Sequence, residues 1–218
     1  PQGPIFCIMP WNYPYWQVLR CVVPSLLLGN TVVLKHAPNV IGCASALQDI
    51  FEVIEGGSGL FQHVIADNDQ AGNIIKDERI IGVALTGSER AGSAVAAIAG
   101  GALKKCVLEL GGSDPFIVLS DADIDAAIQA AVTSRFGNAG QVCIAAKRIL
   151  VDAKIEAEFT DHIVLKDGQR WQAYYDCLET MKCDFIDFSE SLMGEAETTR
   201  TTTMHLIEEW CKKSGRHD

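Results

Sequence analysis

The chain has 218 residues, 48% of them hydrophobic and 21% charged, so it can bury a sizeable core and is globular rather than disordered. Its formal net charge of −10 at pH 7, with no basic stripe, argues against nucleic-acid binding. The eight cysteines have no regular spacing and include no CxxC pair, so they suggest neither a zinc site nor a disulfide framework, and we expect no metal.

No apolar run approaches the ~18–20 residues of a membrane span, and no signal-peptide pattern opens the chain, so we expect no membrane contact. Unpaired cysteines fit the reducing cytoplasm. The chain begins with Pro1 rather than Met and enters an apolar run almost at once. We therefore expect a fragment or a processed product.

Short apolar runs alternate with helical patterns through residue 161. Strands are expected at residues 5–8, 31–34, 61–65, 80–85, 103–110, 115–119 and 149–151. Helices are expected at residues 15–28, 40–54, 93–99 and 124–135, with a short one ending near residue 76. Pro24 implies a kink in the first helix. This alternation predicts an α/β protein with a doubly wound, mainly parallel sheet.

Two segments follow predicted strands at the edge where such sheets bind ligands. In the first, prolines 10 and 14 bracket Asn12, whose amide either makes a turn or points its N–H at a bound oxygen. In the second, Lys35 ends its strand, as a ligand contact or as an ordinary solvated lysine.

The strand at 80–85 runs into a glycine-containing turn, Thr86–Gly92, and then into a helix. Backbone N–H groups and the positive end of a helix dipole make this arrangement suitable for phosphate. The spacing is not GxGxxG, and a tight strand-to-helix turn explains it equally well.

Glu109 lies inside the apolar run at 103–110, just before Gly111 and Gly112. A buried carboxylate there is costly unless it is hydrogen-bonded or functional. Otherwise Glu109 is an exposed strand residue.

Cys143 ends the segment Phe136–Cys143, in which Gly137 and Gly140 permit backbone conformations closed to other residues. A thiol in such a turn can act as a nucleophile if its surroundings support the thiolate. A buried structural cysteine is the alternative.

The pattern weakens after residue 161. Residues 162–218 are polar and charged without a clear period, so we expect them to be partly disordered, with one last helix near 204–213. We expect one domain at 1–110, the start of a second α/β domain at 111–161, and a separate tail at 162–218.

Five motifs in order over residues 1–161 resemble the aldehyde dehydrogenase superfamily, and their wording is most similar to bacterial succinate-semialdehyde dehydrogenases. They are Pro10-Trp11-Asn12, Lys35, Thr86-Gly87-Ser88 with Gly92, Glu109-Leu110-Gly111-Gly112, and Phe136–Cys143. The resemblance implies that 1–110 is a Rossmann-like NAD(P)-binding domain and that 111–161 begins the catalytic domain. It also implies an aldehyde substrate, NADP or NAD as cofactor, and a homo-oligomer for full-length members.

The resemblance also implies a role for each position. Cys143 is the nucleophile, the Asn12 side chain helps to hold the oxyanion, and Glu109 is the general base for thioester hydrolysis. The expected cofactor-binding residues are Pro10, Trp11, Lys35, Gly87, Ser88, Gly92 and Leu110. Where the family often has an acid three residues after the lysine, this chain has Pro38, so we expect NADP+ to be tolerated.

Two departures from the family leave other functions open. Family members are more than twice as long, and no Glu-x-Phe-Gly-Pro-like segment, which grips the nicotinamide-side ribose, is present. A catalytically inactive NAD(P)-binding remnant is therefore the main alternative. A thiol hydrolase that uses Cys143 is a weaker one, since neither His36 nor His63 lies in a motif for a base.

Overall fold

The computed structural model describes residues 1–54 and 56–163. The chain divides into two compact units, Pro1–Gly111 and a second that begins at Gly112, and each is described by itself. The helix expected near 204–213 and nearly all of the expected tail lie outside the described residues.

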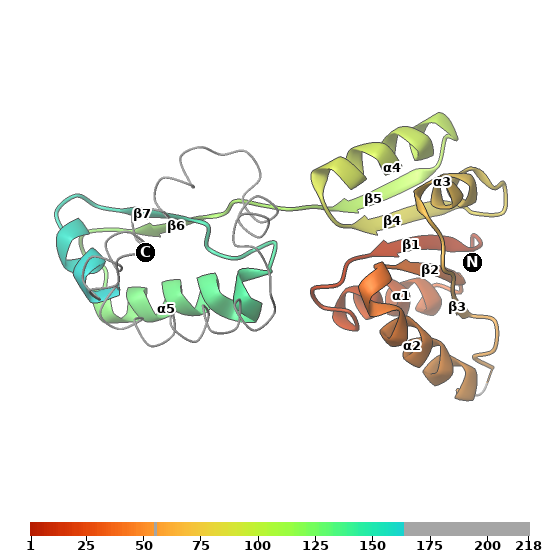
Figure 1. Ribbon diagram of the computed structural model, residues 1–218, viewed down its shortest axis with the longest axis horizontal. Coiled ribbons are helices and arrows are strands. Elements are labelled where there is room, and N and C mark those ends of the chain that lie inside the picture. Colours follow the sequence, from red (N-terminus) through yellow and green to blue (C-terminus); the bar gives the residue numbers. More distant parts are fainter. Residues whose placement is uncertain (55, 164–218) are drawn as a thin grey trace, which may run out of the picture. The chain divides into compact units, whose positions relative to one another are not determined.

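A five-stranded sheet forms the centre of the first unit (Figure 1). Its strands are β1 (Ile5–Met9), β2 (Val32–His36), β3 (Phe61–His63), β4 (Gly82–Thr86) and β5 (Lys105–Glu109). All pairs are parallel, and the order is β3-β2-β1-β4-β5. The predicted α/β fold with a parallel sheet is confirmed, and the carboxyl ends of all five strands lie at one edge.

Helices cover both faces of this sheet (Figure 1). On one face lie α1 (Trp16–Leu27) and α2 (Ile41–Val53), the latter preceded by the short 3₁₀ helix η1 (Pro38–Val40). On the other face lie α3 (Asn68–Lys76) and α4 (Glu89–Gly101). Each helix pair has its own apolar core: Val18, Val22 and Leu47 pack with β1–β3, whereas Ile75, Val95 and Ala99 pack with β1 and β4.

One helix start differs from the sequence prediction. Helix α1 runs through Pro24 to Leu27, within a residue of the predicted bounds. Helix α4 starts at Glu89 rather than residue 93, because the side chain of Ser88 caps it by accepting a hydrogen bond from the N–H of Ala91. Gly92 therefore lies inside the first turns of α4 and not in the loop before it.

Strand β5 has one covered and one open face. Cys106 and Leu108 contact the core under α4, whereas Lys105, Val107 and Glu109 are exposed. This alternation follows from the two-residue period of a strand. The open face leaves the end of β5 accessible from the side that carries α1.

The second unit contains a parallel strand pair with one helix. β6 (Pro115–Val118) pairs with β7 (Arg148–Val151), and α5 (Ile124–Phe136) covers one face of the pair (Figure 1). Its core is formed by Val118, Ile128, Ala131, Val132 and Phe159. The 3₁₀ helix η2 (Gly137–Gly140) follows α5 directly and leads to Cys143.

No helix in the described part of the chain is long and apolar enough to cross a membrane. Within the same residues, no group of three or more His, Cys, Asp or Glu side chains is placed to hold a metal ion.

Candidate functional site

The strand order creates a switch point at the carboxyl edge of the first sheet. The chain passes from β1 to β2 and β3 on one side, and then to β4 and β5 on the other. The loops that leave β1 and β4 therefore diverge, and this is the position at which sheets of this kind bind ligands. The loop 10–15 follows β1, and Gly87 and Ser88 follow β4, so two of the predicted motifs flank the switch point.

A buried histidine fixes the loop that carries Asn12. His36, the last residue of β2, is 5% exposed. Its Nε2 donates to the carbonyl oxygen of Pro14 at 2.9 Å. Its Nδ1 accepts from the N–H of Ala37, which also donates to the carbonyl oxygen of Met9 at 3.0 Å. Both ends of the loop are thus tied to the end of β2, while Trp11 stays 46% exposed between them.

His36 was not identified as a site residue from the sequence, because it belongs to no recognisable motif. The sequence feature that indicates this role is the position of His36 at the end of a predicted strand, between Lys35 and Ala37-Pro38. A histidine at a strand end can be covered by the neighbouring loop and can satisfy that loop's carbonyl groups.

Lys35 supplies a positive charge at this edge. The residue is 9% exposed, and within the described residues its ammonium makes no ion pair or hydrogen bond with another side chain. A cation at the carboxyl end of a parallel strand suits a ribose hydroxyl or a phosphate of a bound ligand. In the register of the sheet Lys35 pairs with Ile8, one residue before the end of β1.

The start of α4 faces the same edge, and two of its glycines play different roles. Gly87 leads into the capping residue Ser88, so the free N–H groups of the first helical turn are available near the switch point. A Cβ on Gly92 would lie 2.6 Å from the side chain of Leu110. In the first unit, Gly92 and Leu110 therefore serve close packing between α4 and the chain that leaves β5.

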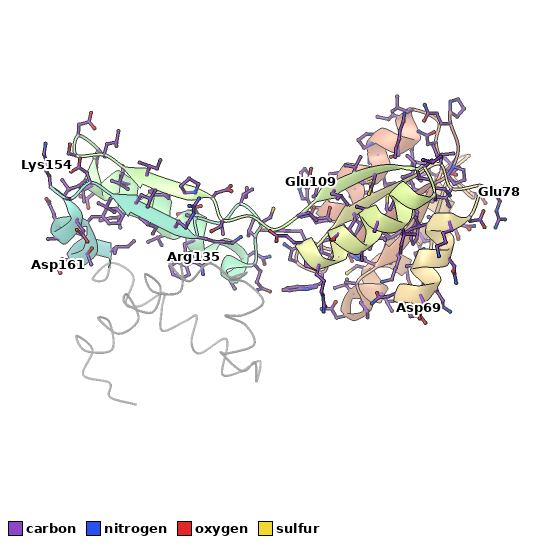
Figure 2. The ribbon with its side chains drawn as sticks, turned by 90° about the horizontal axis from the view of Figure 1, so that it is seen from above. Asp69, Glu78, Glu109, Arg135, Lys154 and Asp161 are labelled. Atoms are coloured by element: carbon purple, nitrogen blue, oxygen red, sulfur yellow. The ribbon has the colours of Figure 1, made fainter. Side chains whose placement is uncertain are left out.

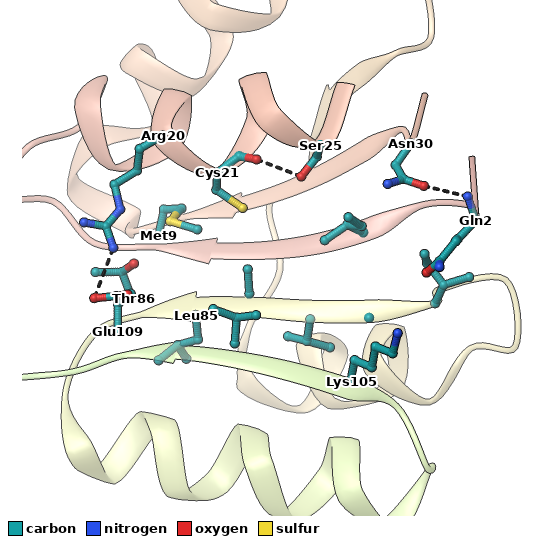
Figure 3. Close-up of a pocket in the computed structure, with 16 residues that line it drawn as sticks. Gln2, Met9, Arg20, Cys21, Ser25, Asn30, Leu85, Thr86, Lys105 and Glu109 are labelled. Carbon is teal, nitrogen blue, oxygen red and sulfur yellow. Dashed lines mark hydrogen bonds and ion pairs between the residues drawn. The ribbon is translucent and has the colours of Figure 1, made fainter. Parts of the chain in front are cut away.

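Glu109 ends β5 (Figure 2) and is paired with Arg20 of α1 (Figure 3). The Arg20 Nη2 and Glu109 Oε2 atoms are 3.1 Å apart, and the two side chains are 36% and 55% exposed. Glu109 is therefore not a buried carboxylate, and its exposure matches the simpler of the two sequence interpretations. The pair lies at one end of a cavity of about 380 Å³ between α1 and the open face of β4 and β5 (Figure 3).

Cys143 lies in the second unit, after a backbone segment of unusual conformation. Asn138, Ala139 and Gly140 all have positive φ angles, of 52°, 55° and 76°. Residues other than glycine rarely adopt positive φ angles, and backbone strain of this kind is concentrated at functional sites. A Cβ on Gly140 would approach the carbonyl oxygen of Arg135 to 3.1 Å, so this glycine is required by both φ and space.

Three hydrogen bonds hold the chain just after this turn. The Lys147 ammonium donates to the Cys143 carbonyl oxygen at 3.0 Å and also to the carbonyl of Gly112. The Ala146 N–H donates to the hydroxyl of Ser134 on α5 at 3.1 Å. Burial, reinforced by the charge of Arg135, lowers the pKa of Lys147. The bonds to Gly112 and Ser134 were not anticipated, because they join residues 35 and 12 positions apart in the sequence.

The predicted residues are therefore grouped in two sets. Pro10, Trp11, Asn12, Lys35, Gly87, Ser88 and Glu109 share one edge of the first sheet. Cys143 belongs to the second unit. The convergence of Asn12, Glu109 and Cys143 on one pocket stays a prediction.

The chain matches the model of the aldehyde dehydrogenase family over residues 1–169. It is 54% identical over 164 residues to the succinate semialdehyde dehydrogenase Sad of Escherichia coli K12, described as NAD(P)+-dependent, covering 75% of this chain and 36% of that enzyme. It is 49% identical over 168 residues to the NADP+-dependent succinate-semialdehyde dehydrogenase 1 of Mycobacterium tuberculosis H37Rv, covering 76% of this chain and 36% of that enzyme.

The same similarity appears among solved structures. The succinic semialdehyde dehydrogenase of Streptococcus pyogenes, solved with NADP+ as cofactor, matches with a TM-score of 0.72 and 40% identity over 77% of this chain and 37% of that one. The chain thus spans little more than a third of the length of these relatives. With the family model matched from residue 1 to 169, the chain belongs to the aldehyde dehydrogenase family.

Proposed function

We propose that this chain carries the cofactor-binding sheet and the nucleophilic cysteine of an NADP+-dependent succinate-semialdehyde dehydrogenase. The observation that carries the proposal is the switch point of the first sheet, which brings the Asn12 loop, Lys35 and the capped start of α4 to one edge. The names of the relatives from E. coli and M. tuberculosis support the choice of substrate and cofactor.

The residues at this edge fit a dinucleotide. Lys35 offers its charge to the adenine-side ribose or to a phosphate on it, and the first turn of α4 offers N–H groups to the pyrophosphate. Pro38 begins η1 and places no carboxylate beside Lys35 that would repel a 2′-phosphate. These features favour acceptance of NADP+, with NAD+ as a second cofactor.

The reaction follows from the residues' chemistry. The Cys143 thiolate adds to the aldehyde carbonyl, and the Asn12 amide together with the Cys143 N–H stabilises the oxyanion. The bound cofactor supplies the hydride acceptor. Once the thioester has formed, Glu109 removes a proton from water, and hydrolysis releases the acid and returns the thiolate.

Arg20 is the residue that we assign to recognition of a carboxylated aldehyde. It is the fifth residue of α1, and its guanidinium reaches the end of β5 beside the cavity (Figure 3). A guanidinium binds a carboxylate through parallel N–H groups, so it prefers succinate semialdehyde to a neutral aldehyde of equal length.

The second candidate is an NAD(P)-binding remnant without turnover. The observation that favours it is the coverage of the relatives, of which this chain spans about 36%. A missing grip on the nicotinamide-side ribose would leave the hydride acceptor poorly placed, and small misplacements cost large factors in rate.

One assay separates the two candidates. The full chain is mixed with NADP+ and succinate semialdehyde, and the absorbance of the reduced nicotinamide is followed. The proposed enzyme produces reduced cofactor, Cys143→Ala abolishes it, and Cys106→Ala, a change of another partly buried cysteine, leaves it intact. Binding of NADP+ without reduction would support the remnant, and a chain that neither binds nor reduces NADP+ would contradict both.

A further inference from the structure

Two cysteines of the first unit lie in direct contact, and neither has a role in the proposed reaction. Cys7 is in the middle of β1 and Cys21 is on α1, and their sulfur atoms are 2.9 Å apart. Cys7 is completely buried, whereas Cys21 is partly buried and lines the cavity between α1 and the sheet (Figure 3). One sulfur of the pair is thus next to a space that a small molecule can enter.

The pKa values of the two thiols are shifted in opposite directions. The hydrogen bond from Cys7 lowers the pKa of Cys21, and Ser25 and the positive charge of Arg20 act in the same direction against the effect of burial. Sharing its proton with Cys21, together with burial, raises the pKa of Cys7. Cys21 is therefore the member that carries the thiolate, and the thiolate is the form of cysteine that reacts.

We propose that Cys7 and Cys21 form an oxidation site at which a hydroperoxide converts the two thiols into a disulfide between β1 and α1. The contact distance supports this, because the sulfurs need to approach by only about 0.9 Å to reach the ~2.05 Å of a disulfide. The two residues lie on elements that already pack against each other.

The chemistry balances with hydrogen peroxide as oxidant. The Cys21 thiolate attacks one peroxide oxygen, the O–O bond breaks, and hydroxide leaves, which yields a sulfenic acid on Cys21. The Cys7 sulfur then gives up its proton and attacks the Cys21 sulfur, and the sulfenic oxygen leaves as water. Two thiols are oxidised, and one peroxide is reduced to two molecules of water.

The bond would join positions 14 residues apart and would fix the turn of α1 that also carries Arg20. Oxidation therefore links the redox state of this pair to the residue that contacts Glu109. The site is independent of Cys143 and does not depend on the proposed reaction.

Trypsin separates every described cysteine, which makes the test direct. Cys7 falls on the peptide 1–20, Cys21 on 21–35, Cys43 on 36–76, Cys106 on 106–135 and Cys143 on 136–147. The full chain is treated with hydrogen peroxide, its remaining thiols are alkylated, and the digest is analysed by mass spectrometry without reduction. We expect the peptides 1–20 and 21–35 to appear joined, two hydrogens lighter than their sum, and to separate after reduction.

Controls keep the result specific. The same treatment in concentrated urea should lose the preference for this pairing, because there the contact is absent. Cys106→Ser should retain the joined species and Cys21→Ser should lose it. The proposal is overturned if Cys7 remains alkylatable after peroxide treatment while Cys21 passes to sulfinic acid. It is also overturned if Cys7 pairs equally with Cys43 or Cys106, or if urea does not change the pattern.

Discussion

The guanidinium of Arg20 lies 3.1 Å from the carboxylate of Glu109 and links α1 to the end of β5. Both side chains are more than a third exposed, so the pair contributes little to stability, about 0–1 kcal/mol. A weak exposed pair exchanges partners easily. A substrate carboxylate can therefore take the place of Glu109 on Arg20 and leave Glu109 free to act on water.

Replacing Arg20 should change substrate preference. In Arg20→Gln we expect the KM for succinate semialdehyde to rise on the order of 10-fold or more, since a charged hydrogen bond is worth about 1.5–3 kcal/mol. The KM for butanal, which has no carboxylate, should change little. Steady-state reduction of NADP+ with both aldehydes measures this, and Arg79→Gln, which breaks the ion pair with Asp77, is the matched control. Equal losses with both aldehydes would rule out recognition of the carboxylate.

Gly140→Ala should destabilise the turn before Cys143. The change forces a side chain into a backbone with φ of 76° and against the Arg135 carbonyl, which costs about 1–3 kcal/mol. Thermal unfolding measures the loss of stability, and the rate of Cys143 alkylation reports the altered turn. Gly137→Ala is the control, because a Cβ there meets no atom within 4 Å. If both variants behave alike, the turn does not depend on the conformation of Gly140.

His36→Ala should loosen the loop that carries Asn12. The carbonyl oxygen of Pro14 loses its buried donor, and we expect a loss of about 1–3 kcal/mol in the free energy of unfolding. The fluorescence of the nearby Trp11 should also shift as the loop becomes more exposed. His63→Ala is a suitable control, since His63 ends β3 at the same edge and its ring is hydrogen-bonded to Ser45 of α2 rather than to the Asn12 loop. An unchanged fluorescence spectrum in His36→Ala would contradict the positioning role.

Periodicity in the sequence was sufficient to predict the alternation of strands and helices, because each element buries one apolar face. It was less successful at the boundaries, where single side chains decide. Ser88 caps α4 and moves its start back to Glu89, which places Gly92 inside the helix. The sequence pattern alone placed residues 89–92 in the turn before the helix.

Contacts between distant residues were the least predictable part of the site. Glu109 was identified from its place before two glycines, but its partner Arg20 lies 89 residues earlier, on another element. The bonds from Lys147 to Gly112 and from His36 to Pro14 are of the same kind. Only the folded sheet brings these groups together, and no local pattern marks them.

Pro38→Glu should shift the cofactor preference toward NAD+. The new carboxylate follows β2 by two residues and would lie near Lys35, where it can bind ribose hydroxyls and repel a 2′-phosphate. We expect weaker binding of NADP+ and equal or tighter binding of NAD+. Pro38→Gln, which adds similar bulk without charge, isolates the electrostatic part. A parallel loss of both cofactors in Pro38→Glu would show that the charge is not the cause.

The proposed NADP+ site is at the carboxyl edge of the first sheet, beside Lys35. Isothermal titration of NADP+ into the chain and into Lys35→Met tests this site, with Lys105→Met, an exposed lysine at the start of β5, as control. We predict measurable binding by the unmodified chain and by Lys105→Met, and a loss on the order of 10-fold or more in Lys35→Met. Equal affinity in all three proteins, or no binding in any, would contradict the claim.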